Sequence, residues 1–163
     1  MLVGSGNPEE GELRPQLPDR FGLSVDLTSP RDVPTRVEVI RRRDAYDRDR
    51  EVFLKKWRAK DAALRRAILA AREALSALVT PDQVLEDCAV LCIALGSDGL
   101  RSELTLLRAA RALAAYDTAT TVTRAHLRRV AASALRHRLR RDPLDDAGSG
   151  LRVARTLDQV LPG

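Results

Sequence analysis

Hydrophobic and polar positions divide the chain into a short strand-like beginning and a long helical remainder. Residues Leu2–Gly6 form an apolar run that predicts a short buried strand. The segment "GLSVDL" (residues 22–27) alternates apolar and polar side chains, which predicts a second strand. Between them, "LRPQLPDRF" predicts one or two helical turns, which Pro15 and Pro18 interrupt.

Apolar residues recur at helical spacing after the second strand. We expect Ser29 to be the N-cap and Pro30 the first residue of a helix that ends in a run dense in Arg and Asp. The segment "EVFLKKW" should then lead to a longer helix from about Lys60 to Leu78.

The next helix begins at Thr80-Pro81-Asp82 in the same way and is broken at Gly96–Gly99 by "GSDG". Its apolar positions repeat at helical spacing and are expected to face a core. These positions are Val84, Leu85, Cys88, Leu91, Cys92 and Leu95.

Three more helices are predicted towards the end of the chain. One runs from Leu100 to about Tyr116, one is capped by Thr123, and a weak one spans Leu151–Leu161 after the loop "RRDPLDDAGSG". The expected inward residues are Leu104, Leu107 and Leu113 in the first, and Leu127, Val130, Ala131, Ala134 and Leu135 in the second.

The fold class that follows is mainly α. Two strands cannot form a stable sheet alone, whereas the helices can form a bundle. We therefore expect the last two strands of an α/β core followed by a helical bundle, in a chain that is the second half of a larger protein, with Met1 internal or an accidental start. The predicted boundaries are 1–57 for the end of the core and a connecting helix, 58–141 for the bundle, and 142–163 for a loop and a short helix.

Composition changes this picture little. Charged residues make up 31%, aromatic residues 3%, and the net charge is +5, which suggests either an anionic partner or solvated helix surfaces. The most basic run, "RAHLRRVAASALRHRLRR", is compatible with a nucleic-acid-binding helix, a protein–protein surface, or a helix face with local ion pairs. We favour the ion pairs, because aromatic stacking residues are absent and Asp142, Asp145 and Asp146 follow at once.

His126 and His137 lie three helical turns apart, too far to share a metal.

Cys88 and Cys92 are four residues apart in an apolar run, and we interpret them as buried free thiols rather than as a metal site. No run of about 18 apolar residues and no secretory signal occur in the sequence. A soluble cytoplasmic protein is therefore expected.

Asn7, Arg20 and Arg101 stand where nucleotide chemistry would need them. An Asn at the C-terminal edge of a strand can hold a water or a γ-phosphate oxygen. Arg20, at the end of the following helix, could reach a neighbouring subunit's nucleotide as an arginine finger, and Arg101 could close the site from the helical domain. Taken singly, each has an ordinary alternative: a turn residue, a surface ion pair with Asp19, and a solvated helix residue.

The segments "LVGSGNPEEGELRPQLPDRFGLSVDL", "LEDCAVLCIALGSDGLRSELTLLRAARALAAYD" and "ALRHRLRRDPLDDAG" resemble the second half of the AAA+ ATPase module. More narrowly, they are similar to the I subunit family of magnesium chelatase, over nearly the whole chain. The resemblance implies that Asn7 is the sensor-1 residue and that Arg20 is the arginine finger, with Asp19 beside it at a subunit interface. It also implies that Arg101 is the sensor-2 arginine.

The resemblance further implies hydrolysis of Mg-ATP in a hexameric ring, with ATP and Mg²⁺ as cofactors, in chlorophyll or bacteriochlorophyll biosynthesis. The expected partners are a larger D subunit and an H subunit that holds protoporphyrin IX while Mg²⁺ is inserted. This chain would couple hydrolysis to conformational change in those partners.

Two features depart from the family. No G-x-x-x-x-G-K-[ST] and no acidic strand end occur, so the chain alone is expected neither to bind nor to hydrolyse ATP well. Pro18 stands where the family more often has Leu, which bears on the approach of Arg20. Two other interpretations stay open: an AAA+ chaperone-like ATPase that remodels a metalloenzyme, and a helical interaction module.

Overall fold

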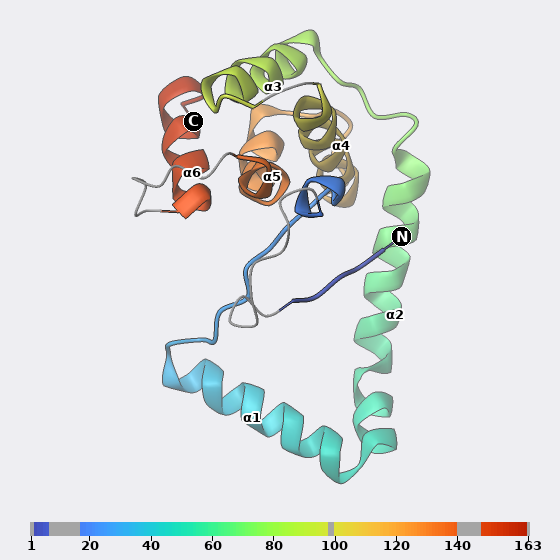
Figure 1. Ribbon diagram of the computed structural model, residues 1–163. Coiled ribbons are helices and arrows are strands. Elements are labelled where there is room, and N and C mark those ends of the chain that lie inside the picture. Colours follow the sequence, from blue (N-terminus) through green and yellow to red (C-terminus); the bar gives the residue numbers. More distant parts are fainter. Residues whose placement is uncertain (1, 7–16, 98–99, 140–147, 163) are drawn as a thin grey trace.

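The computed structural model describes residues 2–6, 17–97, 100–139 and 148–162, and they are helical over most of their length (Figure 1). The elements in order are the 3₁₀ turn η2 (Pro18–Arg20), α1 (Val33–Arg48), α2 (Arg50–Ala74), α3 (Asp82–Ala94), α4 (Arg101–Tyr116), α5 (Arg124–Leu135), the 3₁₀ turn η3 (Arg136–Arg138) and α6 (Gly148–Val160). Figure 1 shows α3 to α6 gathered in one bundle, while α1 and α2 form an L-shaped arm outside it. The prediction of a mainly α fold with a helical bundle is confirmed.

The bundle is built around α4 and α5. Small residues on the facing sides, Ala110 and Ala114 of α4 and Ala131 and Ala134 of α5, are fully buried and let the two helices approach closely. Larger aliphatic side chains from all the bundle helices complete the core. They are Val84, Leu91, Leu95, Leu106, Leu127, Leu135, Val153 and Leu157.

The inward face of α3 was predicted well, and that of α4 was not. Leu85 is the one predicted core position of α3 that the structure leaves exposed, at 44%. In α4, Leu104 is 46% exposed, Leu107 and Leu113 are partly buried, and the buried row is Ser102, Leu106, Ala110 and Ala114. Close packing against α5 selects small residues at the contact, so the buried row follows Ala110, Ala114 and Leu106 rather than the predicted leucines. For α5, the predicted residues are buried, with Val130 only partly so.

Two predicted helix starts are wrong, and proline chemistry explains one of them. The first helix does not begin at Ser29 and Pro30 but at Val33, where the Asp32 carboxylate accepts a hydrogen bond from the Thr35 amide at 2.9 Å. In a helix starting at Pro30, Pro34 would sit where an amide N–H is required; within the first turn of α1 it needs none.

The second error concerns "EVFLKKW", which is not a connection but the first two turns of α2. Asp49 caps this helix by accepting from the Val52 amide at 3.0 Å, and the helix ends at Ala74 rather than near Leu78. The cap at Thr123 is confirmed: its amide donates to Nδ1 of His126 at 3.0 Å. The start at Thr80 is displaced by one position, because the N-cap of α3 is Pro81.

Residues in the left-handed conformation follow the ends of α3 and α4: Gly96, at the predicted break, and Thr118. Gly96 follows α3 with φ 65°, and the amide of Ser97 donates to the carbonyl of Cys92 at 3.0 Å. Thr118 follows α4 in the same left-handed conformation, with φ 58°. A β-branched residue rarely adopts this conformation, so the turn is strained.

Neither predicted strand forms in the described part of the chain. Residues 2–6 and 22–27 have no ladder partner there, and the pairing of Val79 with Thr121 is an isolated parallel bridge. The reason is that a strand needs neighbouring strands to satisfy its backbone groups, and this chain supplies too few. No described helix is long and apolar enough to cross a lipid bilayer.

Candidate functional site

Arg20 is the last residue of η2 and its side chain is exposed. The turn is closed by hydrogen bonds from the Arg20 amide to the Leu17 carbonyl at 3.1 Å and from the Phe21 amide to the Pro18 carbonyl at 3.0 Å. Pro18 occupies the first position of the turn, where no N–H is needed and its fixed φ suits the 3₁₀ conformation. Pro18 is therefore compatible with the turn that presents Arg20. Asp19 lies in the same turn, and its side chain is outside the described structure.

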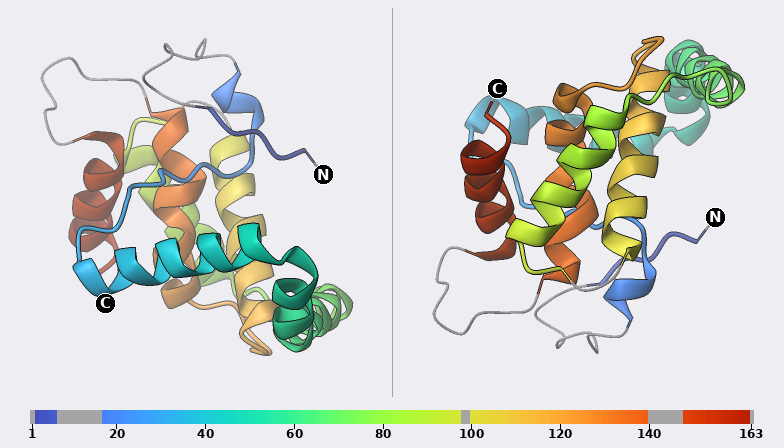
Figure 2. Two further views of the ribbon diagram at one scale, coloured as in Figure 1. Left: turned by 90° about the horizontal axis from the view of Figure 1, so that it is seen from below. Right: turned by 90° about the horizontal axis from the view of Figure 1, so that it is seen from above.

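Arg101 is the first residue of α4, and its side chain is also exposed. It therefore lies where the unpaired N–H groups and the dipole of the helix favour an anion. The two views of Figure 2 place the start of α4 and the η2 turn at the same end of the bundle. The structure thus brings Arg20 and Arg101 to one region, while Asn7 lies outside the described residues.

This pair of guanidinium groups suits a polyanionic ligand such as a triphosphate. In the described parts of the chain, no group of three or more His, Cys, Asp or Glu side chains is placed to hold a metal ion. The described geometry therefore offers positive charge of the kind that binds phosphate groups.

The segment that follows Arg20 lies on the end of α5 and on η3. The Phe21 carbonyl accepts hydrogen bonds from Nη2 of Arg138 at 2.7 Å and from Nε2 of His137 at 3.0 Å. The Ser24 amide donates to the Ser133 carbonyl at 2.8 Å, and Nη1 of Arg136 pairs with Oδ2 of Asp26 at 2.7 Å. Sequence reasoning missed these contacts, because residues more than 100 positions apart in the chain show no local pattern.

The arginines of the basic run that the structure describes make contacts inside the molecule. Arg124 pairs with Asp87 of α3, Arg129 pairs with Asp117, and Arg128 donates to the carbonyl of Leu161 just beyond α6. These contacts tie α5 to its neighbours. They favour the ion-pair interpretation of the run over a nucleic-acid-binding helix, since the guanidinium groups already have partners. His126 and His137 likewise serve the fold, the first at the start of α5 and the second on Phe21.

The Asp87–Arg124 pair is the most buried ion pair in the described structure by the exposure of its carboxylate. Both guanidinium contacts, Nε to Oδ2 and Nη2 to Oδ1, measure 2.9 Å, and the Asp87 side chain is 4% exposed. Hydrogen bonds from Arg124 hold the pKa of Asp87 below its ordinary value, although burial acts in the opposite direction.

Cys88 and Cys92 are buried free thiols, as predicted. Burial in the apolar core raises the pKa of each to about 12. Neither thiol is ionised near neutral pH, so neither is suited to nucleophilic chemistry.

A comparison with known protein families finds a match for the helical bundle. Residues 85–157 match the family model of the AAA lid domain, which corresponds to α3 to α6. The bundle is therefore the lid of an AAA protein.

Three similar curated relatives all carry the same name. The chain is 68% identical over 162 residues to the magnesium-chelatase 38 kDa subunit of Rhodobacter capsulatus and 70% identical over 162 residues to that of Cereibacter sphaeroides, in each case over 99% of this chain. It is 57% identical over 157 residues, 96% of this chain, to the protein of the same name from Acidiphilium rubrum. The chain belongs to the magnesium-chelatase I-subunit family of the AAA+ superfamily. It spans about half the length of these relatives, from 46% to 48%.

Proposed function

We propose that this chain is the lid-bearing part of the ATPase motor subunit of a magnesium chelatase. The whole subunit would form an AAA+ ring, a hexamer by family resemblance, in which ATP hydrolysis drives insertion of the substrate Mg²⁺ into protoporphyrin IX. A D subunit and a porphyrin-holding H subunit would complete the enzyme of chlorophyll or bacteriochlorophyll biosynthesis. The observation that carries the proposal is the identity of 68–70% to proteins named as magnesium-chelatase 38 kDa subunits over nearly the whole chain.

Arg20 is proposed to act on the nucleotide of a neighbouring subunit. When bound, ATP supplies the phosphoryl group whose hydrolysis releases the free energy used by the ring. A guanidinium group that stabilises charge on the transferring phosphoryl group contributes on the order of 10³–10⁵ in rate. The exposed position of Arg20 at the end of a short turn supports a role in trans, because it can reach beyond its own subunit.

Arg101 and Asn7 are proposed to complete the site. Arg101, at the positively polarised start of α4, would bind phosphate oxygens and link nucleotide state to the position of the lid. Asn7 would hold the attacking water or a γ-phosphate oxygen through its side-chain amide. The sequence has no phosphate-binding loop, so the remaining grip on ATP and Mg²⁺ is assigned to the part of the relatives that this chain does not span.

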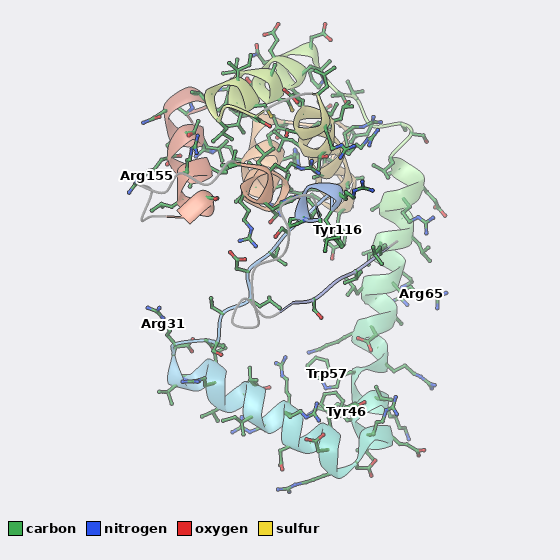
Figure 3. All side chains as sticks on the ribbon, viewed as in Figure 1. Arg31, Tyr46, Trp57, Arg65, Tyr116 and Arg155 are labelled. Atoms are coloured by element: carbon green, nitrogen blue, oxygen red, sulfur yellow. The ribbon has the colours of Figure 1, made fainter. Side chains whose placement is uncertain are left out.

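Mutation of Arg20 in a full-length subunit tests the proposal. Arg20→Ala should lower ATP turnover about 10³-fold or more while ATP binding is kept, because the finger acts mainly in the transition state. Arg155→Ala on α6 is the matched control: its side chain is exposed and points away from the bundle in Figure 3, so turnover should not change.

Mixing experiments and reconstitution separate the alternatives. Rings that combine Arg20→Ala subunits with subunits mutated in the phosphate-binding loop should regain part of the activity if Arg20 works in trans. Formation of magnesium protoporphyrin with D and H subunits supports the chelatase. ATP hydrolysis without metal insertion would instead favour a chaperone-like ATPase, and a full-length protein that binds no ATP would favour an interaction module.

A further inference from the structure

We infer that Arg136, His137 and Arg138 are positioning residues for Arg20, and that they make the arginine finger part of the lid. They lie in η3, directly after the last turn of α5, at the end of the basic run. This inference rests on the proposed function of Arg20 and assigns a role to a motif, "RHR", that the nucleotide chemistry alone leaves unused.

Two side chains of η3 bind the backbone directly after Arg20. The Phe21 carbonyl belongs to the residue that follows Arg20, and it accepts hydrogen bonds from both Arg138 and His137, at 2.7 and 3.0 Å. A charged donor and a second donor on one carbonyl fix the direction of that peptide. The direction in which the chain leaves η2 is therefore set by η3.

The extended segment that follows Arg20 is bound to α5 and η3. The Ser24 amide donates to the Ser133 carbonyl of α5 at 2.8 Å, and Arg136 pairs with Asp26 at 2.7 Å. The apolar side chains of this segment contribute little, since Leu23 is 55% and Val25 is 67% exposed. The segment is thus held to the lid by polar contacts, not by a hydrophobic core.

Arg101 belongs to the same packed bundle as η3. Helix α4 begins with Arg101 and packs against α5 through the buried alanines of the bundle core. Because packed cores deform little, a movement of the lid carries α4, α5 and η3 together. Arg101 and Arg20 would then move together. A change of nucleotide at the site that Arg101 serves would displace the finger that serves a second site, which gives sequential coupling around a ring.

The contacts of η3 with the segment after Arg20 can be tested in the 163-residue chain without any nucleotide. Hydrogen–deuterium exchange of the peptide covering residues 20–26 should accelerate about tenfold or more in the double variant His137→Ala/Arg138→Ala, since its backbone protection depends on these contacts. Exchange in α3 and α4 should stay as in the unmutated chain, and Arg155→Ala should change neither region. Unchanged exchange of residues 20–26 in the double variant would overturn the inference at once.

The consequence for turnover is tested in the full-length ring. Arg138→Ala should lower kcat about 10- to 100-fold with little change in the KM for ATP, because the finger is misplaced rather than removed. Arg138→Lys, which keeps a cationic donor, should recover most of the loss. If Arg138 acts through Arg20, the double variant Arg20→Ala/Arg138→Ala should be no slower than Arg20→Ala alone.

Asp26→Ala provides a second variant that does not threaten folding, because the Asp26 side chain is 81% exposed. It should lower kcat in the same direction and by less than Arg138→Ala. Loss of turnover in Arg20→Ala together with unmutated rates in the η3 and Asp26 variants would refute the positioning role and leave the proposed function intact. Unmutated turnover in Arg20→Ala would instead remove the proposed function.

Discussion

The bundle and the arm are both helical and differ in the interactions that stabilise them. In the bundle, α3 to α6 bury an apolar core, with Leu91, Leu106 and Leu127 fully inaccessible to solvent. In the arm, α1 has no buried residue and Ala71 is the one buried residue of α2. The bundle is therefore stabilised by burial. In the arm, α2 packs against α4 near its C-terminal end, where Nη2 of Arg111 donates to the Leu75 carbonyl at 3.2 Å. The rest of the arm depends on interactions within and between its two helices.

Those interactions are local in sequence. Asp32 and Asp49 cap the two arm helices, and Glu38 pairs with Arg42 one turn further along α1. At the corner between α1 and α2, Tyr46 and Phe53 meet edge to face with ring centroids 5.5 Å apart, and the region of Tyr46 and Trp57 is seen in Figure 3. A short helix with such contacts is marginal without tertiary cover. The helices α3 to α6 thus enclose their own core, whereas the arm leaves apolar side chains such as Ile40 and Leu64 exposed.

Thiol labelling should reveal the largest difference between the two regions. Cys88 and Cys92, whose pKa values of about 12 lie three units above the ordinary 9.0, should react about 10³-fold more slowly than an ordinary thiol from the loss of thiolate alone. A cysteine placed in the arm by Leu64→Cys should react at the ordinary rate. The measurement is the labelling rate in the native protein at pH 8, and fast reaction of Cys92 would contradict the buried core.

Matched leucine truncations compare the same chemistry in the two regions. Leu127→Ala should lower the free energy of unfolding by about 2–5 kcal/mol, because it opens a cavity in a packed core. Leu64→Ala, at a side chain that is 50% exposed, should change it by less than about 1 kcal/mol. Urea unfolding followed by circular dichroism measures both, and equal losses would mean that the arm is covered in solution.

The ion pair between α3 and α5 should have an intermediate effect. Asp87→Asn should cost about 1.5–3 kcal/mol, since it removes the charge from strong hydrogen bonds at a buried carboxylate. Because the pKa of Asp87 is lowered in the folded state, its contribution is present above the unfolded value near 3.8 and is lost as the pH falls through the lower folded value. Unfolding of both proteins between pH 7 and pH 2 checks this. The stability difference between Asp87→Asn and the unmutated chain should shrink only at the acidic end.

The turns that end α3 and α4 should give the smallest effects, of opposite sign. Thr118→Gly should stabilise the bundle by about 1 kcal/mol, because glycine adopts the left-handed conformation without the steric cost. Gly96→Ala should destabilise it by about 1 kcal/mol for the same reason. Thermal unfolding of the two variants measures the shifts, and a lower melting temperature for Thr118→Gly would show that the turn is not strained.

The sequence alone determined that the chain is mainly helical, that its bundle helices are broken near Gly96 and capped at Thr123, and that Cys88 and Cys92 are buried. These features depend on residues within a turn or two of each other, where spacing and capping chemistry suffice. Residue chemistry and the family resemblance together singled out Asn7, Arg20 and Arg101, and their roles in catalysis stay predictions.

The buried face of α4 and the long-range polar contacts follow from how the helices pack together in three dimensions. Local spacing favoured the leucines of α4, whereas close packing on α5 selected Leu106, Ala110 and Ala114. The pairing of Asp87 with Arg124 and the hold of η3 on Phe21 join residues far apart in the chain. Such contacts depend on the relative placement of whole helices, which is set by packing and which no short stretch of sequence encodes.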